Sequence, residues 1–182
     1  MDAIQEKIRN TRVLVAGCGA GSTIAESMVR TGFTKFFLAD HDTVSSHNLN
    51  RQAYEFKDLN RPKVEALRDR LVGINPDIEV EAFNERVTQK NVAKIVGKID
   101  FVIDTIDFLN LPDVIALHDE SHLQKKPYCP ASPPAGARRA FIFLGAIHAP
   151  RARFSVFQNT GPSMGNLILS VLPGSCRCWG LT

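Results

Sequence analysis

The sequence lacks the features that mark secreted and membrane proteins. Its four cysteines, at positions 18, 129, 176 and 178, include no C-x-x-C pair, so neither a disulfide framework nor a tetrahedral zinc site is indicated. No apolar run reaches the length of a membrane span, and the opening residues, MDAIQEKIRNTR, are too polar for a signal peptide. We therefore expect a cytoplasmic protein with reduced thiols.

The concentrated charge that favours nucleic-acid binding is absent as well. The 22 basic and 19 acidic residues are spread along the chain without long runs of like charge or an arginine-rich arm, and the net charge is only +3. Hydrophobic residues make up 44% and charged residues 23%, which disfavours disorder, collagen and coiled coil. A length of 182 residues suits one globular domain, and no nucleic-acid or membrane partner is implied.

What the sequence does contain is an alternation of strand-like and helix-like segments. Continuous apolar or alternating runs predict strands, and apolar residues at helical spacing predict the helices between them. The expected order is a strand at 13–18, a helix at 22–32, a strand at 36–39, a helix at 62–73, a strand at 78–83, a short helix at 87–97, a strand at 101–106 and a helix at about 111–124. This order predicts an α/β fold: a doubly wound, Rossmann-like, mostly parallel sheet with helices on both faces.

The pattern changes toward the C-terminus. KKPYCPAS, residues 125–132, is expected to be a fifth strand, and ARRAFIFLGAI, residues 137–147, a longer strand that pairs antiparallel at the sheet edge. Residues 148–182 contain one strong apolar segment, LILSVL, and predict no definite element. We therefore expect one Rossmann-like domain over 1–147 and an unassigned tail over 148–182 that suggests truncation.

A glycine cluster lies between the first predicted strand and the first predicted helix. Gly17, Gly19 and Gly21 precede Ser22, which stands where G-x-G-x-x-G has its last glycine. The cluster could serve turn geometry alone, but free amides and the positive end of a helix dipole also attract phosphate. Its position between strand and helix favours a nucleotide phosphate.

Asp40 ends the second predicted strand, about twenty residues beyond the glycines, where an acid can accept hydrogen bonds from a ribose. The glycines and Asp40 together indicate a nucleotide but do not identify it, since NAD, FAD and ATP all carry a ribose and phosphates. A hydride-transfer enzyme would show the same two features.

The polar segment LADHDTVSSHNLNRQ, residues 38–52, distinguishes these nucleotides. Arg51 in this segment and Lys63 at the next helix start could reach back over the glycines, although both could equally be solvated surface charges. Asp104 and Asp107 end the fourth predicted strand and could hold Mg²⁺ against phosphate oxygens. Asp107 is preferred as metal ligand because it lies further beyond the strand, whereas Asp104 could cap the following helix. Cations and a metal site favour ATP over a dinucleotide.

These segments carry a family resemblance. Residues 13–52, 61–80 and 101–107 resemble the adenylating family that includes ThiF, MoeB, HesA and the ubiquitin-activating E1 enzymes. The resemblance implies an ATP-Mg²⁺ site and adenylation of a carboxylate, commonly the C-terminus of a ubiquitin-like or sulfur-carrier protein, and it implies a homodimer. By position, it places Gly17, Gly19 and Gly21 under the phosphates, Asp40 on the ribose, Asn48, Arg51 and Lys63 around the triphosphate, and Asp107 on the metal.

The chain also departs from the family. Phe108 stands where asparagine is usual, no arginine follows before Arg138, and the paired C-x-x-C zinc site is absent. Three hypotheses therefore stand: an adenylating enzyme, an NAD-dependent oxidoreductase and a nucleotide-binding scaffold without catalysis. The acceptor of the first could be a protein C-terminus, a tRNA-linked carboxylate or a free acid. Of the polar segment's other residues, Asp42 is expected to fix the loop, and His41 and His47 to be solvated.

Overall fold

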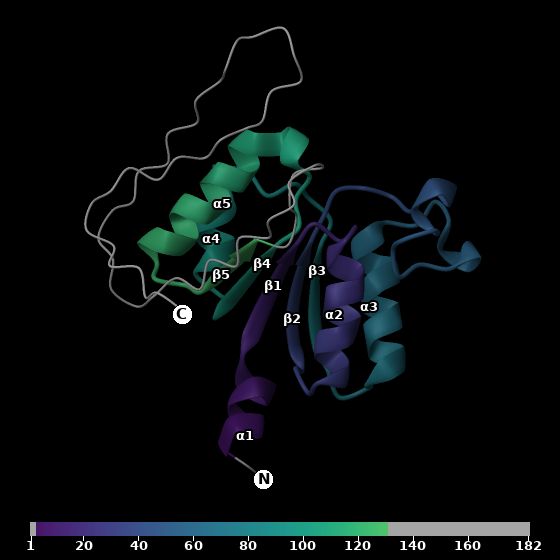
Figure 1. Ribbon diagram of the computed structural model, residues 1–182, viewed down its shortest axis with the longest axis horizontal. Coiled ribbons are helices and arrows are strands. Elements are labelled where there is room, and N and C mark those ends of the chain that lie inside the picture. Colours follow the sequence, from purple (N-terminus) through teal and green to yellow (C-terminus); the bar gives the residue numbers. More distant parts are fainter. Residues whose placement is uncertain (1–2, 131–182) are drawn as a thin grey trace, which may run out of the picture. The chain divides into compact units, whose positions relative to one another are not determined.

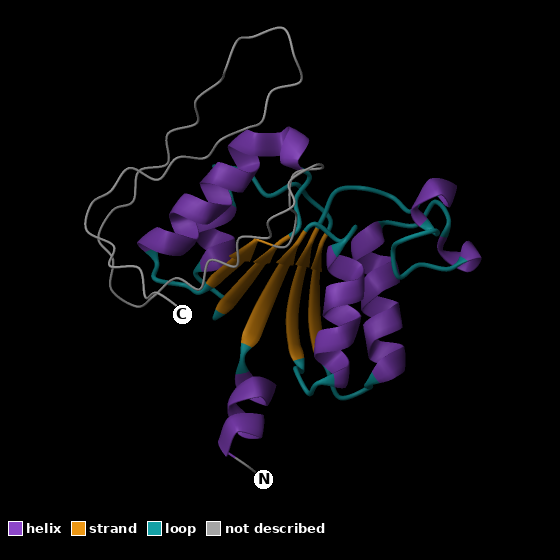
Figure 2. Cartoon of the chain, in the orientation of Figure 1, coloured by secondary structure: helices purple, strands orange, loops and turns teal. Residues whose placement is uncertain are grey.

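The computed structural model describes residues 3–130, which contain a five-stranded sheet in the order β3-β2-β1-β4-β5. The strands are β1 (Arg12–Ala16), β2 (Lys35–Ala39), β3 (Glu79–Phe83), β4 (Phe101–Asp104) and β5 (Tyr128–Pro130). Every neighbouring pair is parallel, so all five strands point toward the same side (Figure 2). We call this side the carboxyl edge, and it is where a doubly wound sheet binds its ligands.

The helices cover both faces of the sheet, as Figure 1 shows. α2 (Gly21–Arg30) and α3 (Lys63–Ile74) pack on one face, and α4 (Val92–Val96) and α5 (Leu111–Leu123) pack on the other. A short helix, α1 (Ala3–Asn10), precedes β1, and single turns of 3-10 helix lie at Ser46–Asn48, Phe56–Asp58 and Phe108–Asn110. The predicted doubly wound α/β fold with helices on both faces is confirmed.

Strand alternation divides the apolar residues between two cores. Val13 and Val15 of β1 face the core under α2 and α3, whereas Leu14 and Ala16 face the core under α4 and α5. All four side chains are fully buried. Burial on both faces explains why the strand reads as a continuous apolar run.

Some predicted boundaries were wrong by a few residues. The strands predicted at 13–18 and 101–106 end earlier, at Ala16 and Asp104. The short helix predicted at 87–97 begins only at Val92, because the preceding residues form a turn in which Asn91 Oδ1 accepts from the Thr88 amide at 2.8 Å. The expected strand at 137–147 and the tail at 148–182 lie outside the described residues. No helix within residues 3–130 is long and apolar enough to cross a bilayer.

Candidate functional site

The turn after β1, residues 17–21, is called here the glycine turn, and two of its glycines are required by packing. Gly17 has a φ of 88°, and a Cβ there would lie 2.5 Å from the Thr105 carbonyl oxygen. A Cβ on Gly21 would lie 2.6 Å from Thr105 Oγ1 and 2.6 Å from Val15 Cγ1. The chain therefore turns away from β1 in close contact with the segment that follows β4.

The middle of the glycine turn leaves backbone donors unused. Within the described part of the chain, the amides of Gly19, Ala20 and Gly21 have no hydrogen-bond acceptor. They lie at the start of α2, where the helix dipole is positive. At Gly19 itself, a Cβ would approach only the end of the flexible Gln52 side chain, at 3.2 Å. This arrangement can bind an anion such as a phosphate.

Asp40 is almost fully buried at the end of β2 and binds the backbone on both sides of it. Its Oδ2 accepts from the Cys18 amide at 2.6 Å, and its Oδ1 accepts from the Asp42 amide at 2.9 Å. The carboxylate thus ties the glycine turn to the polar loop, which we define as residues 40–62. Each oxygen keeps a second lone pair, so the predicted ribose contact stays a prediction.

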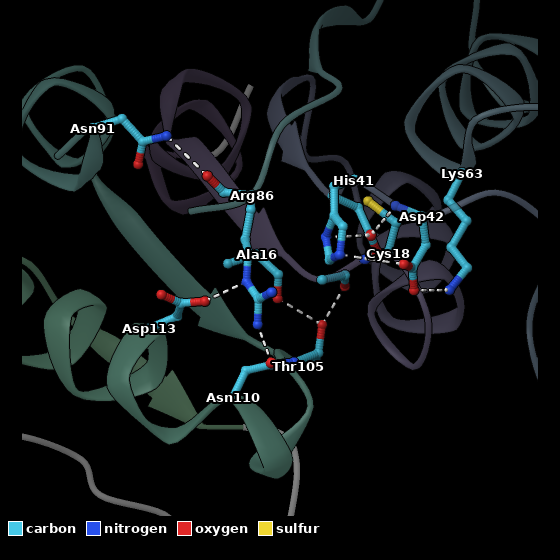
Figure 3. A network of polar contacts seen from close by, with 12 residues as sticks. Ala16, Cys18, His41, Asp42, Lys63, Arg86, Asn91, Thr105, Asn110 and Asp113 are labelled. Atoms are coloured by element: carbon cyan, nitrogen blue, oxygen red, sulfur yellow. Dashed lines mark hydrogen bonds and ion pairs between the residues drawn. The ribbon is translucent and has the colours of Figure 1, made fainter. Parts of the chain in front are cut away.

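Lys63 begins α3 and is only 6% exposed. Its Nζ lies 2.9 Å from Asp42 Oδ2, and its amide donates to the Asp42 carbonyl oxygen at 2.9 Å (Figure 3). Burial opposes ionisation of Asp42, but the hydrogen bond and charge of Lys63 lower its pKa overall, with smaller contributions from His41 and Arg86. Asp42 therefore fixes the loop, as expected, and the buried ammonium already has an anionic partner.

The other polar residues of the loop bind locally. Arg51 is exposed, and its Nη1 donates to the His47 carbonyl oxygen at 2.8 Å and to Asn50 Oδ1 at 3.1 Å. Asn48 is buried, and its Oδ1 accepts from the Ser45 amide at 3.0 Å. The structure thus places Arg51 and Asn48 in their own turn of the loop, and their triphosphate contacts stay predictions.

Three residues hold the site together, and two of them, Tyr54 and Thr105, were not singled out by the sequence analysis. Tyr54 is buried, and its hydroxyl donates to the Cys18 carbonyl oxygen at 2.6 Å, which anchors the polar loop to the glycine turn. Thr105 Oγ1 lies within hydrogen-bonding distance of the carbonyl oxygens of Ala16 and Gly17, and its single proton can serve one of them at a time. Ser22 Oγ accepts from the Ala53 amide at 2.9 Å. An aromatic residue inside a polar loop and a threonine directly after a buried strand were the available sequence signals.

The two acids after β4 differ in their environment. Asp104 is buried, accepting from the Tyr128 hydroxyl and from the Ile106 amide, and burial raises its pKa although both hydrogen bonds oppose the rise. Asp107 is exposed, with one oxygen accepting from the Leu109 amide at 3.1 Å. Mg²⁺ usually takes one or two carboxylates and completes its shell with water and phosphate oxygens. Asp107 fits that requirement better than Asp104.

A second group of ligand atoms lies in the polar loop. Asp40, His41 and Asp42 each offer one such atom, all within 4.8 Å of one another. The His41 side chain is 48% exposed, in line with the expected solvation, although its ring lies 3.5 Å from an Asp42 oxygen. Two backbone amides already donate to Asp40, and Lys63 neutralises Asp42, so this group is poorly suited to a cation.

The described cysteines do not have the environment of a nucleophile. Cys18 is fully buried, and burial, followed by the charge of Asp40, raises the pKa of its thiol well above the usual value. Cys129 is half-buried on β5. Cys176 and Cys178 lie outside the described residues.

A doubly wound parallel sheet with a glycine turn leading into α2 places the chain in the Rossmann-like class of α/β proteins. Within that class, the ThiF family model matches residues 1–156. The chain belongs to the ThiF family, which confirms the resemblance on which the functional prediction depended.

Three relatives illustrate the match. The sulfur carrier protein adenylyltransferase of Thermus thermophilus is 32% identical over 85% of this chain and 52% of its own. The ubiquitin-like modifier-activating enzyme 5 of Caenorhabditis briggsae is 37% identical over 56% of this chain and 26% of its own. The crystal structure of the E. coli tRNA N6-threonylcarbamoyladenosine dehydratase in complex with ATP has a TM-score of 0.65 and 31% identity, covering 69% of this chain and 52% of that one.

The chain spans about half or less of each of these three relatives. The family match over residues 1–156 includes the glycine turn and the polar loop of this chain. The site described above lies entirely within the part that this chain shares with the family model.

Proposed function

We propose that the chain binds ATP at the carboxyl edge and transfers its AMP group to a carboxylate, releasing pyrophosphate. The observation that carries the proposal is the row of amides at Gly19, Ala20 and Gly21, which lie at the positive end of α2 and have no acceptor among residues 3–130. The ATP complex of the E. coli relative and the adenylyltransferases among the other relatives support the choice of nucleotide and reaction.

The site residues have the following proposed roles. The amides of the glycine turn hold the phosphates, with Gly17 and Gly21 providing the turn and Gly19 the open approach. Asp40 accepts from the ribose hydroxyls with its remaining lone pairs. Lys63 and Arg51 exchange their present partners, Asp42 and the His47 carbonyl, for phosphate oxygens, and Asn48 supports them from the same turn.

Mg²⁺ is the proposed metal, and Asp107 is the residue that would hold it. When bound, the ion neutralises charge on the β and γ phosphates and so favours departure of pyrophosphate. The exposed position of Asp107 and its single internal hydrogen bond leave an oxygen for that purpose.

The reaction requires little acid–base chemistry from the protein. The acceptor carboxylate is already ionised near neutral pH, and one of its oxygens attacks the α phosphorus. The bond from the α phosphorus to the bridging oxygen breaks, and pyrophosphate leaves with that oxygen and the electron pair. The product is an acyl adenylate, so catalysis consists of positioning and of stabilising the charge that develops on phosphate.

For the acceptor, we propose the C-terminus of a ubiquitin-like or sulfur-carrier protein, because relatives of this chain carry those names. A tRNA-linked carboxylate is the second candidate, favoured by the structural match to the E. coli dehydratase. We further propose that the chain works as a homodimer in the cytoplasm.

Exchange of labelled pyrophosphate into ATP tests the proposal. The full chain is incubated with Mg-ATP and, in turn, a sulfur-carrier protein, a ubiquitin-like protein and threonylcarbamoyl-modified tRNA. We expect exchange with one acceptor and its loss in Asp107→Ala, Arg51→Ala and Lys63→Ala. Exchange that all three variants retain would refute the assigned roles.

The alternatives give different results in the same preparation. Tight binding of NAD(H) without Mg²⁺ would identify an oxidoreductase. ATP binding by calorimetry with no exchange for any acceptor would identify a scaffold without catalysis. Sedimentation of the purified chain tests the proposed homodimer.

A further inference from the structure

Arg86 makes a side-chain bridge that the proposed reaction does not use. It lies in the loop between β3 and α4, and its Nε is 2.5 Å from Asp113 Oδ2 in the first turn of α5. Its Nη2 donates to Asn110 Oδ1 in the turn before α5 (Figure 3). One guanidinium thus binds two side chains that follow β4.

The bridge joins loops that are not neighbours in the sheet. β3 is the edge strand, and β2 and β1 separate it from β4. With strands about 4.8 Å apart, β3 and β4 are separated by roughly 14 Å. Arg86 lies beyond the end of β3, and Asn110 and Asp113 lie beyond the end of β4. The contact therefore spans the ends of β2 and β1, the strands that Asp40 and the glycine turn follow.

Both ends of the bridge are fixed. Asn91 Nδ2 donates to the Arg86 carbonyl oxygen at 2.9 Å and so holds the backbone that carries the arginine. The Asp113 side chain is only 16% exposed and sits in the first turn of α5, where a negative charge is favoured. Asn110 is the N-cap of α5 but makes no capping hydrogen bond, and its oxygen accepts from Arg86 instead.

The guanidinium also acts on the polar loop, which follows the neighbouring strand β2. Its charge is one of the influences that lower the pKa of Asp42, after burial, Lys63 and His41. Arg86 therefore lies within electrostatic range of the Asp42–Lys63 pair in the polar loop while it binds Asp113. Figure 3 shows Arg86 between these two groups.

We propose that Arg86 is a positioning residue of the adenylation site. Together with Asn110 and Asp113 it forms a tie across the ends of β2 and β1. The tie holds residues 105–110, and with them Asp107, over the phosphates that the glycine turn binds. The proposal rests on the proposed function, since it gives Asp107 a reason to be held in place.

An ordinary surface ion pair is the alternative, because the Arg86 side chain is 43% exposed and exposed pairs contribute little to stability. The two interpretations differ in what the pair controls. A surface pair would affect stability slightly and nothing else. If the contact is a tie, its removal would increase the motion of residues 105–110 and reduce the contribution of Mg²⁺ to ATP binding.

The test compares Arg86→Gln with the unaltered chain in two measurements. Amide hydrogen exchange without nucleotide follows residues 105–110, where the Leu109 amide donates to Asp107. Calorimetry gives the ATP dissociation constant with and without Mg²⁺. Lys98→Gln is the matched control, because Lys98 is a half-exposed cation 3.6 Å from Glu81 and precedes β4, at the opposite edge of the sheet.

In Arg86→Gln we expect faster amide hydrogen exchange at residues 105–110, since charge-assisted hydrogen bonds position the segment. We also expect the factor by which Mg²⁺ lowers the ATP dissociation constant to be about tenfold smaller than in the unaltered chain. Lys98→Gln should change neither. The double variant Arg86→Asp with Asp113→Arg, which swaps the two charges, should partly restore slow amide hydrogen exchange and the effect of Mg²⁺ on ATP binding.

If Arg86→Gln binds ATP but changes neither or only one of the two quantities, amide hydrogen exchange at residues 105–110 and the effect of Mg²⁺ on ATP affinity, Arg86 is not a positioning residue. The proposed function would be unaffected by that result. If the unaltered chain binds no ATP, the proposed function fails and the role of the tie fails with it. Equal effects in Arg86→Gln and Lys98→Gln would also overturn the proposal.

Discussion

The hydroxyl oxygen of Tyr54 lies 2.6 Å from the carbonyl oxygen of Cys18 and 3.3 Å from that of Lys63. A phenol has one proton to donate, and the shorter contact, to Cys18, takes it. The ring is buried beside both carbonyl groups, so one side chain joins the glycine turn to the start of α3. The proposed nucleotide site is therefore held together by a residue that we do not expect to touch the nucleotide.

Replacing Tyr54 with phenylalanine should loosen this junction. The Cys18 carbonyl would lose its donor inside the core, which costs about 1–2 kcal/mol of unfolding free energy. The affinity for Mg-ATP should fall as the polar loop separates from the glycine turn. Urea unfolding and calorimetry measure the two effects, and full stability together with full affinity would contradict the assigned role.

The three glycines should respond differently to alanine. Gly17→Ala places a side chain at a φ of 88° and against the Thr105 backbone, so we expect a loss of about 2–4 kcal/mol in unfolding free energy. Gly19→Ala meets only the Gln52 side chain, so the fold should be retained while the methyl group reduces ATP affinity. Chemical unfolding of both variants, with ATP titration of the second, checks this contrast. A Gly19→Ala chain that binds ATP normally would argue against phosphate at this turn.

Thr105→Val keeps the volume of the side chain and removes its hydroxyl. The Ala16 carbonyl oxygen would keep the Thr105 amide as a donor, but the hydroxyl would no longer serve the Gly17 carbonyl oxygen, and we expect a loss of about 1–3 kcal/mol of stability. Thr23→Val is the control, because Thr23 is exposed and its hydroxyl donates to the carbonyl oxygen of Ala20, the N-cap of α2. Equal unfolding midpoints for the two variants would show that the Thr105 hydroxyl does not support the turn.

The Asp42–Lys63 pair predicts a dependence on pH. Because the pKa of Asp42 in the folded chain lies below its ordinary value of 3.8, the pair stabilises the fold above that value and ceases to do so as pH falls through the lowered pKa. Asp42 is half exposed, so Asp42→Asn should cost only about 0.5–1 kcal/mol at neutral pH after allowance for solvent screening. The difference in unfolding free energy between Asp42→Asn and the unaltered chain should shrink as the pH falls below 3.8. Urea unfolding at neutral and acid pH measures this difference, and a difference that stayed constant would contradict the assignment.

Most strands and helices of the fold were predictable from local sequence patterns. The apolar run of β1 and the helical spacing in α3 both lie where they were predicted, because burial on two faces or on one stripe leaves a regular trace in the sequence. Strand ends were misplaced because Gly17 and Thr105 continue the apolar or β-prone composition while leaving the sheet. The residue that ends a strand depends on tertiary contacts such as the one between Thr105 and Gly17.

The site was predictable only in part. Gly17, Asp40 and Asp107 lie on the carboxyl edge, where strand ends place them, and these positions followed from the order of elements. The partners of Lys63 and Arg51 did not follow, because a cation's nearest acceptor depends on how a loop without regular periodicity folds back. The contact between Arg86 and Asp113, 27 residues apart, left no local signal at all.

The central claim is that a carboxylate oxygen attacks the α phosphorus of ATP at this site. It is tested most directly by supplying the acceptor with isotopically heavy oxygen in its carboxylate and analysing the AMP that is finally released by mass spectrometry. The account predicts one heavy oxygen in each AMP, because the acyl adenylate keeps the carboxylate oxygen on phosphorus. AMP that carries oxygen only from ATP and water would contradict it.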